Sequence, residues 1–345
     1  MDDFRSQAYN NLEIEDTKQM LESFTKLAND NLKDIRSPNI EIPTFPMDRC
    51  EKINHNTFEK ESWEFGKRPI YLMNGGYSGQ YLKANSLKIH GKISEKSYVY
   101  LRENLFCEDC FGYVEAKNII ANNVGHSWGN SIAGLPKFLV RENLIVNGKT
   151  FFANIDAWNA EFKDLVENSY INIGRLGIFH SIGKGTTIKV NPNNSCLINY
   201  LDQEIQLMIK KLNYLKSGKN FLNNEVTNMQ NHYKTMASIE LDRISSRARE
   251  SVIKNKLAYE KLLDNYKKMD SFLLDKLFHK KLEETSNLIY AYKSIGLQKA
   301  KIFIKKIEKP FINISFGGQN IEVSSKFKNI VVLLKNNKVT IENWV

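Results

Sequence analysis

The chain of 345 residues lacks any long hydrophobic run. No apolar stretch approaches the roughly 18–20 residues that a membrane-spanning helix needs, so we expect no transmembrane segment. The N-terminal residues MDDFRSQAYNNLEIED are polar and acidic, and they contain no apolar core of a secretory signal. The sequence therefore predicts a cytoplasmic protein.

Cysteine is scarce, with only Cys50, Cys107, Cys110 and Cys196 in the chain. Four cysteines do not form a disulfide framework at this length. Cys107 and Cys110 form a single C-x-x-C pair, but no second pair or suitably spaced histidine completes a structural zinc site. We interpret them as small buried side chains, with metal binding or redox chemistry as the alternative. We expect no cofactor and no metal.

Proline and glycine are almost missing from one long stretch. No proline lies between Pro192 and Pro310, and only Gly218 and Gly296 fall between Ser195 and Lys309. Because both residues interrupt helices, their absence favours helix. One series of apolar residues with alternating spacings of three and four consists of Ile198, Leu201, Ile205, Met208, Leu212, Leu215, then, after a skip at Lys219, Leu222, Val226, Met229, Tyr233 and Met236.

A second such series consists of Tyr259, Leu262, Tyr266, Met269 and Leu273, after which the spacing slips. The two series flank a polar stretch at 238–249. They are heptad seams, and they predict two long antiparallel helices of about 40–50 residues each that meet in this polar stretch. We expect a coiled-coil helical hairpin over 197–308. Two helices of an ordinary globular bundle, or an intermolecular coiled coil, are the alternatives.

The positive charge is concentrated in this same stretch. The whole chain has a net charge of +10, and 201–309 holds 22 Lys and Arg against 13 Asp and Glu, a difference of +9. Such an excess suits nucleic acid, anionic lipid or an acidic protein. Because the basic residues are spread between acidic ones, we favour a solvated helical surface.

Short alternating bursts of apolar residues occupy 68–192, where most of the glycines lie. Each burst opens with an aromatic or β-branched pair and contains an Asn-rich corner. The clearest are YLKANSLKIHG (81–91), YVYLRENLFCE (98–108), YVEAKNIIANN (113–123) and FLVRENLIVNG (138–148), with looser versions at 155–160 and 170–173. Short strands joined by such corners favour a solenoid, since stacking on the next coil supplies the stability that one short strand lacks.

The heptapeptide LRENLFC at 101–107 nearly recurs as VRENLIV at 140–146. In a solenoid, inward apolar positions alternate with outward polar ones along each strand. We therefore predict that the two copies occupy equivalent inward positions of different coils, through Leu101, Leu105 and Cys107 in one and Val140, Leu144 and Val146 in the other. The favoured fold is a parallel β-helix over 68–196. An antiparallel sandwich or barrel made of the same strands is the alternative.

The N-terminal part predicts a helix and a linker. Helical spacing at Leu12, Met20, Leu21, Phe24 and Leu27 indicates an amphipathic helix within 1–36. The stretch SPNIEIPTFP (37–46) holds three of the seven prolines, which predicts an extended linker over 37–67.

The C-terminal part, 309–345, returns to strands. Apolar residues alternate at Ile312, Ile314 and Phe316, and Asn336-Asn337 suits a two-residue hairpin turn. We expect this β-segment to cap the open end of the solenoid and to hide an edge that would otherwise pair with another chain.

Two stretches carry a resemblance to a known family. ENSYINIGRLGIFHSIGKGTTIKVNPNN (167–194) leads directly towards LDQEIQLMIKKLNYL (201–215), and KPFINISFGGQNIEV (309–323) follows the helices. This arrangement, clearest from residue 165 onwards, resembles the bacterial flagellar assembly protein A family. Gly174, Gly177, Gly183 and Gly185 stand where that family tends to have turn residues. The resemblance implies a right-handed β-helix interrupted by a coiled-coil hairpin, and it supplies no catalytic residues.

Catalytic residues are hard to assemble from this sequence. A β-helix enzyme acting on polysaccharides needs two carboxylates across a groove, and no spacing pairs Glu108, Asp109, Glu115, Asp156, Glu161, Asp164 or Glu167 on one face. His126 is a candidate general base and Trp128 a sugar platform, although a loop folded over the stack explains GHSWGN (125–130) better. His180 lacks the six-residue periodicity of hexapeptide acyltransferases, and 183–187 lacks the pattern of a phosphate loop.

These observations predict a non-enzymatic scaffold or adaptor of the flagellar assembly protein A type. The β-helix would supply a stiff body, and the hairpin a long surface for a protein partner or a second copy. A carbohydrate-active β-helix enzyme and an anionic-polymer binder, with nucleic acid held by the basic hairpin, are the alternatives.

Overall fold

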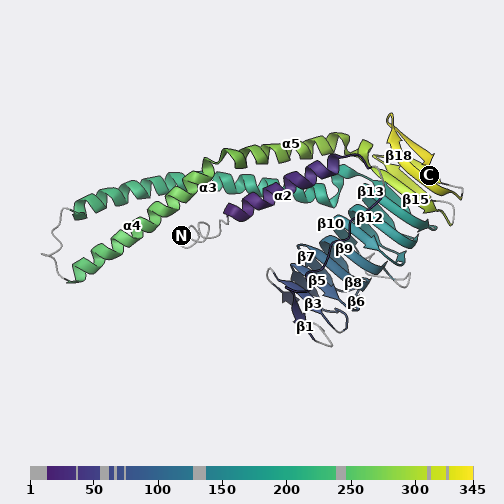
Figure 1. Cartoon of the computed structure of the whole chain (residues 1–345), viewed down its shortest axis with the longest axis horizontal. Helices are drawn as coiled ribbons and strands as arrows, with labels where there is room; N and C mark the ends of the chain where they lie inside the picture. The colour runs from purple at the N-terminus through teal and green to yellow at the C-terminus, as the bar shows by residue number, and fades with distance from the viewer. Residues whose placement is uncertain are drawn as a thin grey trace. The chain divides into compact units, whose positions relative to one another are not determined.

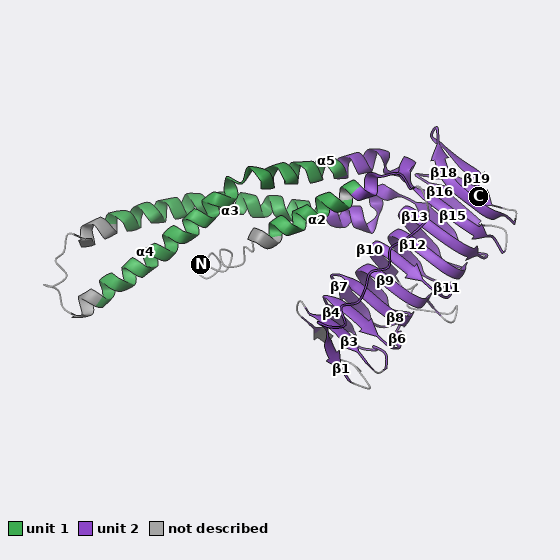
Figure 2. Cartoon of the chain, in the orientation of Figure 1, with its two compact units in different colours: residues 1–29, 202–288 green, residues 30–201, 289–345 purple. Residues whose placement is uncertain are grey.

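The computed structural model describes residues 14–35, 38–54, 62–65, 68–73, 75–126, 137–237, 246–308, 312–323 and 326–344. The chain forms two compact units (Figure 2). The helical unit comprises Met1–Asn29 and Asp202–Leu288, and the solenoid unit comprises Asp30–Leu201 and Ile289–Val345. In the described part of the chain, no helix has the length and apolar character needed to cross a membrane.

The solenoid unit is a β-solenoid of about seven turns, which confirms the predicted class of fold. Its strands stack in chain order, from purple to teal in Figure 1. The strands before the helices are β1 (Glu51–Ile53), β2 (Ser62–Glu64), β3 (Pro69–Leu72), β4 (Tyr81–Ala84), β5 (Ser86–Ile89), β6 (Lys92–Ile93), β7 (Tyr98–Leu101), β8 (Asn104–Cys110), β9 (Tyr113–Gly125), β10 (Lys137–Val146), β11 (Thr150–Phe151), β12 (Asn154–Glu167), β13 (Tyr170–Ile182) and β14 (Thr187–Val190). All pairings among them are parallel, which excludes the antiparallel sandwich or barrel.

The core of the solenoid is a set of columns of inward apolar side chains. One column joins eight strands in register and is fully buried: Leu82, Val99, Val114, Phe138, Ile155, Ile171, Ile188 and Ile314. Each of these residues follows an outward polar or aromatic one, as strand alternation requires. Stacking therefore buries side chains that a single four-residue strand would leave in water.

The two copies of the repeated heptapeptide lie two coils apart, in equivalent positions. Leu105 and Leu144 both pair with Ile119 of the coil between them, and Cys107 and Val146 both pair with Ala121. The predicted inward equivalence of these positions is confirmed.

The polar part of the motif also has a structural reason. The side chains of Glu103 and Glu142, one from each copy, both lie 3.5 Å from Lys117 of the intervening coil. Charges of opposite sign in successive coils attract one another along the stack, which explains why both copies of the motif carry the glutamate.

Four asparagines stack at one corner of the solenoid. The amide of Asn118 donates to Asn104 (2.9 Å), the backbone N–H of Asn143 donates to the Asn118 side chain (3.1 Å), and Asn159 donates to Asn143 (3.0 Å). Each amide therefore satisfies a polar group of the neighbouring coil, which otherwise would be buried without a partner. The series ends where Leu176 takes the position after Asn159.

A second corner requires left-handed backbone. Phe152, Asn168 and Gly185 stand in equivalent positions of three consecutive coils, two residues before the paired Asn154, Tyr170 and Thr187. Their φ angles are +49°, +49° and +69°. Asn and Gly tolerate this conformation, whereas a bulky aromatic residue is strained there.

Replacing Phe152 with asparagine is therefore expected to stabilise the protein by about 1 kcal/mol, because it relieves the left-handed strain. Gly185→Ala at the equivalent corner is the control and should destabilise, since its Cβ would lie 2.4 Å from the Asn168 side-chain oxygen. Urea unfolding of both variants measures the two changes, and a less stable Phe152→Asn variant would contradict this account.

The predicted linker over 37–67 is wrong in its second half, which contains strands. Strands β1 and β2 lie within 37–67, where each pairs with the next coil. The proline-containing stretch before them packs on the solenoid through Ile40, which, like Ile35 just before the stretch, is buried in one cluster with outward apolar residues such as Ile178 and Phe303. Outward positions of a solenoid are usually polar, so these apolar ones require a covering segment.

The C-terminal strands return to the solenoid, as predicted for 309–345, but the return begins earlier, because β15 lies within the stretch 197–308 that was predicted to be helical. They are β15 (Lys301–Lys306), β16 (Ile312–Phe316), β17 (Gln319–Val323), β18 (Lys328–Lys335) and β19 (Lys338–Asn343). β15 and β16 extend the parallel ladders of β13 and β14, and the remaining three pair antiparallel. Asn336 and Asn337 both have positive φ and join β18 to β19, so the predicted two-residue turn is confirmed.

The α-helices in the described residues are α2 (Ile14–Leu32), α3 (Cys196–Ala237), α4 (Ser246–Leu273) and α5 (Lys276–Lys299). The 42 residues of α3 match the first predicted helix, and its predicted seam is buried from Ile198 to Val226 apart from Lys219. The predicted turn within 238–249 lies mostly outside the described residues, as does Leu12 of the predicted N-terminal helix.

The second predicted helix is wrong as one continuous element, because it breaks between Leu273 and Lys276. Asp275 accepts the N–H groups of Leu277 (3.0 Å) and Phe278 (3.1 Å) and so caps the start of α5. The break falls where the apolar spacing slips, and an aspartate at that point was the signal for a new helix start.

Candidate interaction surface

The carboxylates considered for catalysis make structural contacts. Asp109 accepts the side-chain amide of Asn123 (2.8 Å), and Asp164 accepts the N–H of Leu165 (2.8 Å). Glu108 is exposed at a corner, and Glu167 lies against Gly183. No described contact brings two of these candidates together as a pair, so they give no support to a glycosidase arrangement.

Asp156 holds the start of α3. Its carboxylate accepts the backbone N–H of Cys196, the first residue of that helix, at 3.1 Å. Burial raises the pKa of the Asp156 carboxyl, partly offset by the bond from Cys196. Burial, and then the negative charge of Asp156, raise the pKa of Cys196 to about 12. The Cys196 thiol is therefore held in its unreactive protonated form.

This pKa shift predicts a dependence of stability on pH. A carboxyl group whose pKa is higher in the folded than in the unfolded protein stabilises the fold while it is protonated. This contribution is lost as the pH rises above the ordinary value of 3.8 towards the higher pKa of the folded state. Asp156→Asn stays neutral and retains the acceptor oxygen, so its stability relative to wild type should improve from mildly acidic to neutral pH. Urea unfolding of both proteins across that range measures this difference, and a relative loss for the variant would contradict it.

Glu115 belongs to a buried arginine cluster. The Arg141 guanidinium, only 3% exposed, donates to the backbone oxygens of Leu101 (2.9 Å) and Arg102 and lies 3.4 Å from Glu115. The ring of Tyr200 covers it, with a centroid distance of 4.7 Å. Arg141 thus joins the corner of one coil to a coil two turns away, which is a structural and not a catalytic task.

His180 and Glu161 are the two catalytic candidates that the fold brings together. Glu161 lies 3.6 Å from the His180 ring nitrogen, and Lys305 lies 3.1 Å from the same atom. Burial, and then the charge of Lys305, lower the pKa of His180, while Glu161 offsets part of this effect. The imidazole is thus neutral at ordinary pH and accepts a hydrogen bond from the lysine.

The described contacts of the remaining candidates form no catalytic arrangement. His126 lies 3.1 Å from Glu95, but Trp128 lies outside the described residues. Among the residues that the structure describes, no three His, Cys, Asp or Glu side chains gather as metal ligands. Cys107 and Cys110 therefore find no third ligand there.

Exposed apolar side chains concentrate on the helices. Of the large hydrophobic residues exposed in the described chain, nine lie on or beside α3, α4 and α5: Leu207, Tyr214, Phe221, Ile253, Leu257, Leu274, Leu277, Tyr290 and Ile295. On α3, Leu207, Tyr214 and Phe221 recur every seven residues, close to two helical turns, and therefore lie along one side of the helix. We call these three residues the α3 stripe. Exposed apolar side chains that share one side of a helix are a candidate interaction surface.

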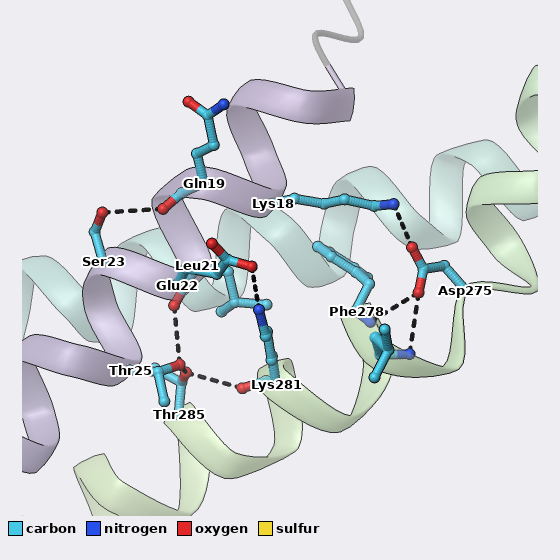
Figure 3. Close-up of polar contacts among 11 residues, drawn as sticks. Lys18, Gln19, Leu21, Glu22, Ser23, Thr25, Asp275, Phe278, Lys281 and Thr285 are labelled. Carbon is cyan, nitrogen blue, oxygen red and sulfur yellow. Dashed lines mark hydrogen bonds and ion pairs between the residues drawn. The ribbon is translucent and has the colours of Figure 1, made fainter.

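Polar contacts hold α2 on α5 within the helical unit (Figure 3). Lys18 pairs with Asp275, and Glu22 pairs with Lys281. The hydroxyl oxygens of Thr25 and Thr285 lie 2.6 Å apart, and Leu21 and Phe24 of α2 are buried. The N-terminal helix is therefore a built-in part of this unit, which its amphipathic pattern alone did not indicate.

A lysine interrupts the α3 seam at position 219. Its ammonium pairs with Asp270 of α4 and lies 5.8 Å from the centre of the Tyr266 ring. A charged residue at one seam position restricts how two helices align.

Comparisons with protein-family models, with curated proteins and with solved structures gave no match.

Proposed function

We propose that the protein is a non-enzymatic scaffold or adaptor that binds a protein partner, or a second copy of itself, through its helices. The α3 stripe is the observation that carries this proposal. Its three side chains are 40–49% exposed, whereas large apolar side chains are often buried in the core of a monomer. An apolar row along a helix suits the apolar face of another helix.

We further propose that α3 and α4 form an antiparallel coiled-coil hairpin inserted into a right-handed β-helix, as the resemblance to the flagellar assembly protein A family implies. Two observations support this arrangement. The less exposed residues of α4 recur with spacings of three and four from Val252 to Leu273, as in a heptad seam. Lys219 and Asp270 join the two helices across their seams. As part of this proposal, the protein acts in the cytoplasm, in flagellar assembly.

The polar groups of the solenoid make structural contacts, which supports the same proposal. Asp156 caps α3, Arg141 binds backbone oxygens, and Glu161 contacts His180. These groups hold the fold, so the function is better sought on the helical surface than on the coils.

The double substitution Leu207→Ser and Tyr214→Ser tests the proposal. It removes the apolar contact area of the α3 stripe without touching the buried seam. We expect the intact chain to capture a specific partner from native cell lysate, or to self-associate in sedimentation, and we expect the variant to lose at least tenfold in affinity, about 1.4 kcal/mol.

The matched control is Ile42→Ser with Tyr170→Ser, since these exposed apolar residues lie on the solenoid unit. It should bind as the intact chain does. Equal binding by the α3 variant, or loss of binding only in the control, would reject the helical surface as the binding site.

A further inference from the structure

Cys107 and Cys110 flank an inner corner of the solenoid. Cys107 pairs with Ala121 and Cys110 with Val124 of the next coil. Between them Glu108 is exposed, and the backbone N–H groups of Glu108 and Asp109 both point to the Gly91 oxygen, at 3.2 and 3.5 Å. The strand thus turns at Glu108, and both thiols face the apolar core.

The same inner corner recurs in the neighbouring coils. In the preceding coil, Ile93 pairs with Cys110. In the following coil, Ala121 pairs with Cys107 and Val124 pairs with Cys110. Side chains at this corner pack on the apolar core in each coil, and here both of them are thiols. The neighbouring Cys110 thiol, together with burial, raises the pKa of Cys107 well above its usual value.

The two thiols differ in access. Cys110 is fully buried, whereas Cys107 is only partly buried. Cys107 is therefore the more accessible of the two to a reagent from the solvent.

We propose that Cys107 and Cys110 are a redox-convertible pair that closes to an intrachain disulfide on reaction with a small disulfide such as oxidised glutathione. The Cys107 thiolate attacks one sulfur of the reagent, forms a mixed disulfide and releases one reduced thiol. Cys110, as its thiolate, then attacks the Cys107 sulfur and releases the second reduced thiol. The protein loses two electrons and two protons, and the reagent gains them.

The reaction has an expected pH dependence. Only the thiolate attacks a disulfide, and the pKa of Cys107 is raised, so closure is slow at neutral pH and becomes faster as the pH rises. This dependence separates the pair from a reactive low-pKa thiol, and it is independent of the proposed scaffold function.

The test treats the folded full-length chain with excess oxidised glutathione at mildly alkaline pH, followed by peptide mass spectrometry. We expect the peptide with Cys107 and Cys110 to lose the mass of two hydrogen atoms, and a phosphine reductant to restore it. Cys50 provides an internal check that the reagent is active, because its peptide is distinct. The same chain unfolded in urea shows whether the pair closes without the fold.

Two variants complete the design. Cys110→Ser should trap one glutathione on Cys107, and Cys107→Ser should leave Cys110 unmodified in the folded chain. The proposal is overturned if the wild-type pair stays reduced in the folded chain but closes in urea, or if Cys107 retains glutathione in the wild-type protein. An unmodified Cys107 in the Cys110→Ser variant also overturns it, because the reagent then does not reach the corner.

Discussion

Arg141→Leu is expected to destabilise the solenoid by about 3–5 kcal/mol, because removing one member of a buried charged network leaves its partners unsatisfied. The backbone oxygens of Leu101 and Arg102 lose their donor, and the half-buried Glu115 loses its cation. Leucine fills most of the apolar volume, so the loss reports the polar contacts and not a cavity. Urea unfolding followed by circular dichroism measures the change.

Arg102→Leu is the matched control, because Arg102 occupies the same place in the first copy of the motif. Its side chain is exposed, and only its backbone oxygen contacts Arg141. We expect this variant to stay within about 0.5 kcal/mol of wild type. Similar losses for both variants would show that Arg141 has no special role.

Trp158→Ala is expected to cost about 3–5 kcal/mol, in the range for removing a fully buried aromatic side chain. The Trp158 indole is completely buried. It donates to the Asn31 side chain at 2.9 Å, and the Tyr292 ring packs edge-on against it with centroids 4.8 Å apart. Gly174 leaves room for the ring, since a Cβ there would lie 2.1 Å from a Trp158 carbon.

The control is Trp344→Ala, because Trp344 also packs on an aromatic ring, that of Phe303, but is only partly buried near the end of the chain. Its cost should be clearly smaller. Hydrogen exchange locates the damage: Trp158→Ala should expose the amides of β12 and β13, whereas Trp344→Ala should affect β18 and β19. An unchanged exchange pattern in β12 and β13 would disprove the role given to Trp158.

Much of the solenoid could be predicted because its signal is local. Strand alternation placed Leu105 and Leu144 inward, and the recurring asparagines indicated the corner where Asn104 and Asn143 lie. The long α3 seam was also predictable, because the absence of proline and the regular apolar spacing are patterns among residues within a few helical turns of one another. The break before α5 was harder to see, because one capping aspartate competes with a long helical pattern.

The candidate site was less predictable. The apolar pattern of α3 revealed its buried seam, but the α3 stripe consists of residues outside that seam, whose exposure depends on where α2, α4 and α5 lie. Glu161 and His180 are 19 residues apart in the sequence, and only the coil length brings them to 3.6 Å.

The sequence by itself determined the class of fold, the inward positions of the coils and the helical stretch after Pro192, because periodicity is a property of neighbouring residues. Only the tertiary structure decided which outward positions are covered. Arg102 and Arg141 share one motif, yet only Arg141 is buried, since Tyr200 covers it. Trp158 is buried by Asn31 and Tyr292, 127 and 134 residues away in the chain. Contacts over such separations depend on how the whole chain closes, and no local pattern encodes them.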